Sequence, residues 1–349
     1  MQRHRIDVIA GDGIGTEVMP VAVACVEAAG ARHGFDIDWR HRDWGSEHYR
    51  QTGSMMPPDG LDELATGDAI LLGAVGAPDI PDHVTLWGLL IPIRRTFDQY
   101  VNLRPVRMLP GVTSPLRGLD ALDMVIVREN VEGEYSEIGG RFNRGLPDET
   151  AVQESVFTRR GVSRVATYAA ELASRRSGRL VSATKSNGII HTMPFWDEVV
   201  ADVAATHGVR VESVLVDALA ARLVLDPRSV DVLVASNLLG DILSDLASAV
   251  AGSLGMAPSG NINPGREHPS MFEPVHGSAP DIAGQGIANP VGQIWAASMM
   301  LEHLGEQAAA DDVMAAVASA LAEGARTRDV GGTCGTAEMG DAVVARLRS

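Results

Sequence analysis

The sequence predicts an α/β fold with much parallel strand pairing. Residues 5–11, RIDVIAG, form an apolar run that closes on glycine, and residues 17–34 then place apolar side chains at helical spacing. The pattern returns at 230–255, where a buried strand-like run precedes a long helix-like one. Strands that alternate with helices in this way are typical of βαβ units around a parallel sheet.

Length and composition predict a globular protein of two domains or of one large domain. The chain has 349 residues, more than one ordinary hydrophobic core contains, and 45% of them are hydrophobic against 21% charged. No Pro/Gly/Ser-rich linker separates two halves, so we expect the chain to cross between the domains more than once.

Charge and targeting signals restrict the partners. The net charge of −16 argues against binding to nucleic acids and to anionic membrane surfaces, because both would repel it. The two cysteines, Cys25 and Cys334, lie far apart and form no zinc or CxxC pattern. The N-terminal segment lacks the apolar core of a signal peptide, and no apolar stretch is long enough to span a membrane. We expect a cytoplasmic protein.

The remaining elements follow from the same patterns. Short alternating runs around glycines at 134–159 predict a hairpin or a protruding arm, and the Gly, Pro and Ala content of 271–290 predicts a long loop. We expect further strands at 35–44, 68–76, 123–130 and 179–187, a strand-to-helix segment at 209–225 with Asp217 at its junction, and helices at 159–176 and 294–305.

The glycines of GDGIGTEV (11–18) lie between the first strand and the first helix. A dinucleotide fingerprint requires G-x-G-x-x-G, and here the third glycine comes one residue early. A tight turn is therefore as good an interpretation as direct binding of a pyrophosphate.

Asp241 and Asp245 lie four residues apart, on one face of a predicted helix. Like charges at this spacing repel each other, and the helix is otherwise apolar. A solvated acidic face is the ordinary interpretation. We favour a divalent ion, Mg²⁺ or Mn²⁺, because carboxylates among apolar residues need to be neutralised and carboxylate oxygens are ligands that such ions prefer.

Three arginines, Arg94, Arg104 and Arg128, each lie beside a predicted strand end or turn, and a guanidinium is well suited to binding a carboxylate. Periodicity cannot show whether they converge. Tyr135, one of four tyrosines, is compatible with packing or, given a coupled pKa, with general acid catalysis.

Lys185 is the only lysine in a chain that has 28 arginines. It stands at the end of a predicted strand, a usual place for functional groups in α/β folds. Lysine can lose its proton when it is buried or placed beside a cation, whereas arginine stays charged. A position that must cycle between ammonium and amine would therefore keep lysine; the alternative is chance retention in an arginine-biased sequence.

Six blocks together resemble the isocitrate/isopropylmalate dehydrogenase family of β-decarboxylating dehydrogenases. In chain order they are GDGIGTEV, NLRPVR, VRENVEGEYS, TKSNG, ASNLLGDILSD and FEPVHGSAPDIAGQGIANP. The resemblance implies a two-domain α/β fold with a large mixed sheet of parallel and antiparallel strands, unlike a classical Rossmann fold. Residues 1–99 and 252–349 would form a discontinuous cofactor-binding domain, and residues 100–251 a smaller domain with the dimer interface and the arm.

The resemblance also implies a role for the candidate catalytic residues. Lys185 would act as the catalytic base with Asp217, both supplied by the second subunit of a homodimer with shared active sites. Tyr135 would protonate the enolate after CO₂ leaves. The Mg²⁺ or Mn²⁺ ligands would be Asp217, Asp241 and Asp245.

For the substrate, the resemblance implies that Arg94, Arg104 and Arg128 bind the carboxylates of a small dicarboxylate. Isopropylmalate enzymes carry a glutamate seven residues before the first of these arginines, and isocitrate enzymes use serine and asparagine nearby; this chain has Trp87 and Leu90. The segments around them look most similar to the tartrate and D-malate dehydrogenase branch. We expect oxidation of D-malate to pyruvate and CO₂, or of tartrate, with 3-isopropylmalate dehydrogenase as the alternative and a non-catalytic regulatory subunit as a remote one.

The same resemblance places NAD in the HGSAPDIAG loop. Asp281 would accept hydrogen bonds from the adenosine ribose hydroxyls and repel a 2′-phosphate, so we expect NAD rather than NADP. A monovalent cation stays open as a further cofactor. The residues expected to bind NAD are Ile14, Glu273, His276, Gly277, Ser278, Ala279, Asp281 and Asn289.

Overall fold

The computed structural model describes residues 2–349 and divides the chain into two compact units. Unit 1 contains the residues up to Gln99 together with Arg107–Ala121 and Ser248–Ser349, and unit 2 contains Tyr100–Val106 and Leu122–Ala247. The chain therefore crosses between the units more than once.

Unit 1 contains a mixed sheet. Its strands are β1 (Gln2–Gly11), β2 (Phe35–His41), β3 (Ala69–Ala74), β11 (Pro258–Ile262) and β12 (Ser270–Pro274), in the order β2-β1-β3-β12-β11. β1 is parallel to β2 and β3, β12 is parallel to β3, and β11 is antiparallel to β12. The prediction of an α/β fold with mixed strand pairing is confirmed.

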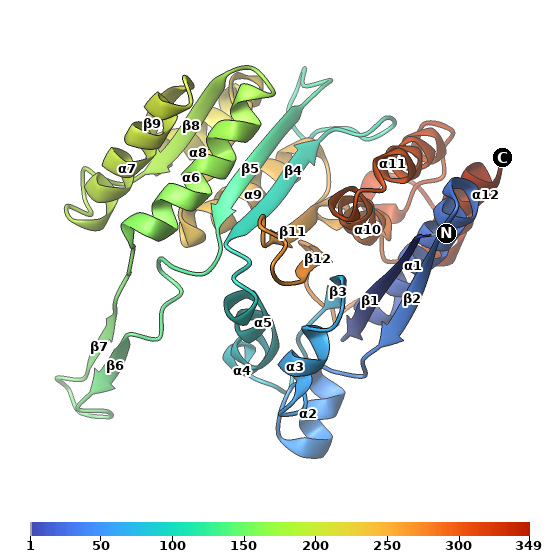
Figure 1. The fold of residues 1–349 in the computed structure, drawn as a ribbon, viewed down its shortest axis with the longest axis horizontal. Coiled ribbons are helices and arrows are strands. Elements are labelled where there is room, and N and C mark those ends of the chain that lie inside the picture. The colour runs from blue at the N-terminus through green and yellow to red at the C-terminus, as the bar shows by residue number, and fades with distance from the viewer. Residues whose placement is uncertain (1) are drawn as a thin grey trace. The chain divides into compact units, whose positions relative to one another are not determined.

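Four long helices of unit 1 pack against one another: α1 (Gly15–His33), α10 (Val291–Leu304), α11 (Gln307–Ala322) and α12 (Thr336–Arg348) (Figure 1). A second hydrophobic core gathers Trp44, Met55, Leu89, Ile93 and Phe97 with side chains of β1, β3 and β12. The short helices of unit 1 are α2 (Ser46–Thr52), α3 (Gly60–Leu64), α4 (Asp82–Thr85), a π-helix (Leu86–Leu90) and α5 (Ile91–Thr96). Unit 1 also contains two single helical turns, Leu254–Met256 and Arg328–Val330.

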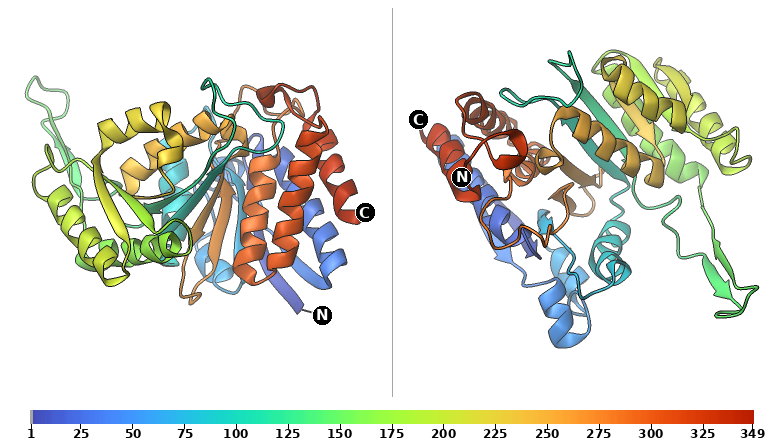
Figure 2. Two further views of the ribbon diagram at one scale, coloured as in Figure 1. Left: turned by 90° about the horizontal axis from the view of Figure 1, so that it is seen from above. Right: turned by 180° about the vertical axis from the view of Figure 1, so that it is seen from behind.

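Unit 2 has its own five strands, in the order β4-β5-β10-β8-β9. They are β4 (Val101–Arg107), β5 (Asp123–Glu129), β8 (Arg179–Thr184), β9 (Arg210–Leu215) and β10 (Val232–Ala235), and β5, β10, β8 and β9 are successive parallel neighbours. Helices α6 (Arg159–Ser174) and α7 (Thr192–Thr206) cover one face of these strands, and α8 (Val216–Leu225) and α9 (Asn237–Ala251) cover the other (Figure 2). A single turn, Pro227–Ser229, follows α8.

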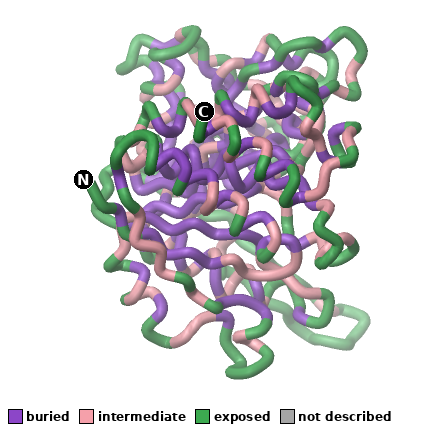
Figure 3. Tube along the Cα trace, turned by 90° about the vertical axis from the view of Figure 1, so that its right-hand side faces the viewer, coloured by how far each residue is buried: buried purple, intermediate pink, exposed green. Residues whose placement is uncertain are grey.

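An antiparallel hairpin of β6 (Gly139–Phe142) and β7 (Thr150–Gln153) protrudes from the rest of unit 2, as the pattern at 134–159 predicted (Figures 1 and 2). All residues of both strands are exposed. Figure 3 shows the contrast between the buried extended segments and the exposed outlying loops. None of the described helices is long and apolar enough to cross a membrane.

Several elements differ from the sequence prediction, which contained neither β4 nor α7. β2 ends at His41 rather than at residue 44, and the predicted loop 271–290 begins as β12, which continues to Pro274. β11 was not predicted at all, because its five residues, PSGNI, carry neither an apolar run nor an alternation.

Candidate active site

The candidate residues of unit 2 follow the carboxyl ends of its parallel strands. Arg128 is the penultimate residue of β5, Lys185 follows the last residue of β8, and Asp217 comes two residues after β9. β10 leads through Ser236 into α9. Because β5, β10, β8 and β9 are parallel neighbours, these residues lie along one edge of the strands.

Asp241 lies at the centre of a charged cluster on α9. Its Oδ1 accepts a hydrogen bond from Arg128 and lies 3.2 Å from Arg104 Nη1. Its Oδ2 accepts a hydrogen bond from the Tyr135 hydroxyl at 2.9 Å. Asp245, one helical turn later, lies 3.4 Å from the same Arg104 nitrogen. The structure thus brings together five of the predicted site residues, which we call the α9 cluster.

Both arginines of the α9 cluster are buried and have further anchors. Arg104 donates from Nε to Asn102 Oδ1 at 2.7 Å and from Nη1 to Ser244 Oγ at 2.6 Å. Arg128 donates from Nε and Nη2 to Asn237 Oδ1, at 3.0 and 2.7 Å. These bonds fix the guanidinium groups, so that an anionic ligand would meet them already oriented.

The apolar residues around Asp241 and Asp245 in the sequence predicted that both carboxylates would be buried, but the structure leaves both partly exposed. The Asp241 side chain is 34% exposed and that of Asp245 is 55% exposed, while Ile242 between them is 56% exposed. Partial burial of Asp245 raises the pKa of its carboxyl group, and the positive charge of Arg104 opposes this shift. Arginines of the same chain therefore supply the neutralising charge for which the sequence argument invoked only a metal.

Tyr135 is held beside α9 by the segment that precedes it. Glu134 accepts hydrogen bonds from Ser236 Oγ at 2.7 Å and from the Leu238 backbone N–H at 3.0 Å, at the N-terminus of α9 where a carboxylate is favoured. Burial raises the pKa of Tyr135, and the neighbouring Asp241 carboxylate raises it further. The phenol therefore keeps its proton and can serve as a donor. Glu134 is a residue that the sequence analysis missed, although it directly precedes the tyrosine.

Lys185 and Asp217 form a separate ion pair in unit 2. Lys185 Nζ donates to Asp217 Oδ1 at 2.7 Å, with the two side chains 33% and 65% exposed. This hydrogen bond lowers the pKa of Asp217. The two residues assigned to one catalytic step are thus in direct contact.

Carboxylate oxygens are suitable ligands for a divalent cation, but one chain does not bring together all three of the predicted metal ligands. In the part of the chain that the structure describes, no three His, Cys, Asp or Glu side chains group as metal ligands. Asp217 therefore does not join Asp241 and Asp245 within a single subunit. The pair on α9 offers hard oxygen donors one turn apart, which fit Mg²⁺ or Mn²⁺ as two of the ligands.

Arg94 belongs to unit 1, where it forms a buried ion pair. Its Nη2 donates to Glu273 Oε1 at 2.8 Å, and the same oxygen accepts from Asn261 Nδ2 at 2.7 Å. The sequence analysis assigned Arg94 to the substrate and Glu273 to the cofactor. Their contact means that the orientation of the arginine depends on the glutamate.

Trp87 and Leu90 lie in the π-helix that joins α4 to α5. The Arg95 guanidinium carbon stacks over the Trp87 indole, 4.9 Å from the ring centroid. Leu90 packs against the second hydrophobic core of unit 1, so packing accounts for at least part of its surface. The π-helix itself, a form often found at functional sites, was not predicted.

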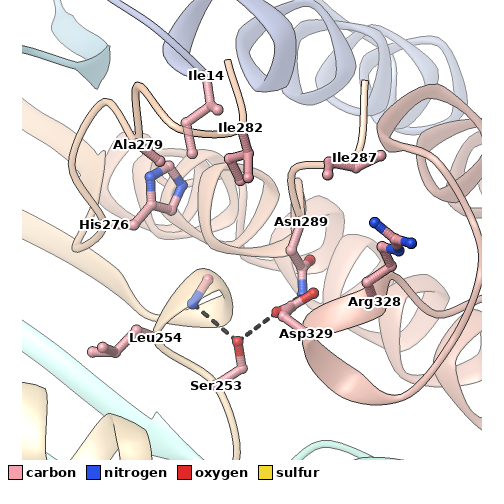
Figure 4. Close-up of a pocket in the computed structure, with 11 residues that line it drawn as sticks. Ile14, Ser253, Leu254, His276, Ala279, Ile282, Ile287, Asn289, Arg328 and Asp329 are labelled. Atoms are coloured by element: carbon pink, nitrogen blue, oxygen red, sulfur yellow. Dashed lines mark hydrogen bonds between the residues drawn. The ribbon is translucent and has the colours of Figure 1, made fainter. Parts of the chain in front are cut away.

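A pocket of about 510 Å³ lies within unit 1 (Figure 4). Four of the predicted cofactor residues line it: Ile14, His276, Ala279 and Asn289. His276 Nδ1 lies 3.0 Å from the Gly277 carbonyl oxygen, and its Nε2 is buried without a hydrogen-bond partner among the described residues. Burial lowers the pKa of His276. An apolar pocket with an unsatisfied, neutral imidazole nitrogen fits the base of a dinucleotide.

Of the other predicted cofactor residues, Glu273 belongs to β12, and Gly277, Ser278 and Asp281 belong to residues 276–290, which we call the cofactor loop. Ser278 accepts a hydrogen bond from the Ile14 backbone N–H at 2.9 Å. Gly13 has φ +54°, and a Cβ there would lie 2.1 Å from the Ser278 carbonyl oxygen. The GDGIG turn is therefore a support for the cofactor loop. Gly277 and Asp281 are exposed and do not line the pocket.

Seven residues that line the pocket were missed. They are Ser253, Leu254, Gly255, Ile282, Ile287, Arg328 and Asp329. Asp329 Oδ2 accepts hydrogen bonds from Ser253 Oγ at 2.6 Å and from Asn289 Nδ2 at 2.9 Å (Figure 4). Ile282 and Ile287 lie within the quoted FEPVHGSAPDIAGQGIANP block, whereas the other missed residues come from two distant segments without a motif, which no spacing rule could have found.

Comparisons with known proteins identify the family of the chain. The family model for isocitrate/isopropylmalate dehydrogenase matches residues 5–343. The chain belongs to the isocitrate/isopropylmalate dehydrogenase family. It is 51% identical to the D-malate dehydrogenase (decarboxylating) of Escherichia coli, over 98% of each protein. It is 50% identical to the tartrate dehydrogenase/decarboxylase of Pseudomonas putida, over 97% of this chain and 96% of that protein.

The solved structures give the same result for the fold. Isocitrate dehydrogenase from Methylococcus capsulatus matches with a TM-score of 0.90 and 32% identity, over 99% of this chain and 100% of that one. The family resemblance read from the six sequence blocks is therefore confirmed, and with it the expectation of a β-decarboxylating dehydrogenase fold and reaction class.

Proposed function

We propose that this enzyme oxidises a small 2-hydroxy dicarboxylate with NAD, converting D-malate to pyruvate and CO₂ and accepting tartrate as well. The observation that carries the proposal is the similarity, over nearly the full length, to both a D-malate dehydrogenase and a tartrate dehydrogenase/decarboxylase at about half identity. The test is an assay of NADH formation and pyruvate release with D-malate, NAD and Mn²⁺.

NAD is proposed as the cofactor on two grounds. The pocket of unit 1 has an apolar lining suited to adenine, and the buried Nε2 of His276 provides an acceptor there. Asp281, exposed on the cofactor loop close to that lining, would accept from ribose hydroxyls and repel a 2′-phosphate. The other residues proposed to contact the cofactor are Ile14, Glu273, Gly277, Ser278, Ala279 and Asn289.

Mg²⁺ or Mn²⁺ is proposed to bind Asp241 and Asp245 of one subunit and Asp217 of the partner subunit. This arrangement requires a homodimer with shared active sites. It would account for the absence of a three-carboxylate group among residues 2–349 of one chain. When bound, NAD supplies the hydride acceptor and the divalent ion supplies a Lewis acid beside the hydroxyl and carboxylate of the substrate.

Arg104 and Arg128 are proposed to bind the substrate carboxylates. Both guanidinium groups are buried within the α9 cluster, and hydrogen bonds to neighbouring side chains fix their orientation. Arg94, oriented by Glu273, is proposed to do the same. Trp87 and Leu90 are proposed to limit the substituent at C3, with Leu90 acting through the position of the π-helix.

Lys185 is proposed to take the proton from the C2 hydroxyl while the hydride leaves C2, which gives a β-keto acid. Asp217 accepts a hydrogen bond from Lys185 and so orients the amine. Loss of the β-carboxylate as CO₂ leaves the C–C electron pair as an enolate. Tyr135 then donates its hydroxyl proton to the enolate carbon, consistent with a phenol that is held protonated.

A 3-isopropylmalate dehydrogenase is the second candidate, since it belongs to the same family. The side chain at residue 87 favours the small substrate, because an indole at this position, stacked on Arg95, would leave less room for an isopropyl group. A regulatory subunit is not supported by the residues, since the Lys185–Asp217 pair and the α9 cluster are both complete. We propose a cytoplasmic location and the discontinuous cofactor domain described above.

A further inference from the structure

The cofactor loop lies against the first turns of α1. Ile14, which directly precedes this helix, and Val18 within it pack against Ile282 and Ala288. The Ile14 backbone N–H donates to the Ser278 carbonyl oxygen at 2.9 Å. Hydrophobic contact and this hydrogen bond hold the loop against the start of α1.

A carboxylate holds one side of the turn that follows Asp281. Glu17, on α1, accepts two backbone hydrogen bonds from the loop. Gly284 N–H donates to its Oε1 at 2.5 Å, and Gly286 N–H donates to its Oε2 at 2.8 Å. Both glycines have positive φ, +79° and +65°. Two amides that point at one anion form a small binding nest, in which charge-assisted hydrogen bonds are stronger than neutral ones.

The other side of the turn is held by α12. The Thr336 backbone N–H donates to the Gly286 carbonyl oxygen at 2.8 Å, and its Oγ1 donates to the Ala288 carbonyl oxygen at 2.7 Å. Gln285 Nε2 donates to the Asp281 carbonyl oxygen at 2.8 Å, which ties the turn to the residue proposed to choose the cofactor. Loss of the Glu17 bonds would free one side of the turn only.

We propose that Glu17 is a positioning residue for the dinucleotide. By bonding two amides of the cofactor loop it sets the backbone that carries Asp281, so that the loop has its binding shape before the cofactor arrives. A loop ordered in advance loses less conformational entropy on binding, and affinity rises accordingly. The inference rests on the proposed function for the identity of the cofactor.

The effect on binding should be separable from any effect on folding. The described hydrogen bonds of the Glu17 carboxylate are these two alone, and Glu17 belongs to no described ion pair. The apolar contacts of α1 come from other residues, among them Ile14 and Val18. Glu17→Gln removes the charge and leaves one acceptor oxygen. Glu27→Gln, the same change at an exposed position of the same helix, is the matched control.

The test is calorimetric titration with NADH of the full-length wild type, Glu17→Gln and Glu27→Gln, together with kcat, the KM for NAD, and Tm. We expect the NADH Kd and the KM for NAD of Glu17→Gln to rise about tenfold, or about 1.4 kcal/mol, with kcat within about twofold. Glu27→Gln should match the wild type. If Glu17→Gln does not fold, Glu17→Asp, which keeps the charge but shortens the reach, should show an intermediate rise.

An unchanged NADH Kd in a folded Glu17 variant would overturn the inference and leave the proposed function intact. The same holds for a variant in which kcat and Tm fall while the KM for NAD does not change. A wild-type protein that binds no NADH would contradict the proposed cofactor, and the inference with it.

Discussion

Lys185 Nζ lies 2.7 Å from Asp217 Oδ1, so that the only lysine of the chain is bonded to a carboxylate that the proposed mechanism assigns to the same step. Asp217 has two candidate partners in the proposed mechanism: Lys185 of its own chain and a divalent ion. An aspartate that turned toward the ion would give up its hydrogen bond with the amine.

Lys185→Arg should therefore abolish turnover without unfolding the protein. Arginine keeps the ion pair with Asp217 but cannot lose its proton near neutral pH. We expect kcat to fall by about 10³-fold, within the range typical of general base catalysis, with NADH affinity unchanged. Steady-state kinetics and NADH titration give the two values. Arg179→Lys, at the start of the same strand and exposed, is the control and should keep full activity. Near wild-type kcat in Lys185→Arg would refute the assigned role.

Shared active sites predict complementation between two inactive subunits. A Lys185→Arg subunit keeps its own Asp241 and Asp245, and an Asp245→Asn subunit keeps a functional Lys185 and Asp217. A mixed dimer would then contain one intact site. If the subunits assort at random, co-expression should restore about a quarter of wild-type activity. The measurement is the activity of the co-expressed pair against each variant alone, and activity no higher than that of the variants would place all catalytic residues of a site in one chain.

Substrate size should depend on residue 87. Trp87→Glu removes the indole and places a carboxylate near Arg95. We expect the ratio of kcat/KM for 3-isopropylmalate to that for D-malate to rise about tenfold or more, because a pocket that loses bulk admits a larger substituent. Trp87→Phe, which keeps an aromatic ring over Arg95, should leave the ratio nearly unchanged. Equal ratios in both variants would mean that Trp87 does not face the substrate.

The buried Glu129 predicts a specific pH dependence of stability. Burial raises its pKa from 4.5 to about 7, although the Val131 and Glu132 backbone N–H groups donate to the carboxylate. The folded state therefore binds the proton more tightly than the unfolded state. The free energy of unfolding should fall by about 3 kcal/mol as pH rises from about 4.5 to about 7 and stay level above that range.

Glu129→Gln should lack this contribution, because an amide does not titrate. Urea unfolding of both proteins at pH 5 and pH 8 measures the difference. The wild type should lose about 3 kcal/mol more than the variant between the two conditions. The same loss in both proteins would show that Glu129 is not protonated in the folded state at pH 5.

Sequence patterns predicted the features that depend on local periodicity or on long motifs. The first strand and helix, the arm and the strand before Lys185 were found because each carries an apolar run, an alternation or a glycine cluster. The motif around residues 235–245 located Asp241 and Asp245 one turn apart. Family motifs also selected Tyr135, which alone would have passed for a packing residue.

Features that depend on chain segments meeting in space could not be predicted. The sequence gives no sign that Arg104 and Arg128 both reach Asp241, so the need for a counter-ion was assigned to a metal alone. Asp329 links two segments of the cofactor pocket, but in the sequence alone it cannot be distinguished from the many other acidic residues. Glu17 lies inside a block that was read for its glycines, and its two amide partners come from a loop 267 and 269 residues further along the chain.

The most direct test of the account is a substrate panel with the wild-type enzyme. Initial rates with NAD and Mn²⁺ would be measured for D-malate, L- and meso-tartrate, 3-isopropylmalate and isocitrate, with NADH, pyruvate and CO₂ quantified for D-malate. The account predicts the highest kcat/KM for D-malate or a tartrate isomer, and equal amounts of NADH, pyruvate and CO₂ from D-malate. A highest kcat/KM for 3-isopropylmalate or isocitrate, or NADH formed from D-malate without CO₂, would contradict it.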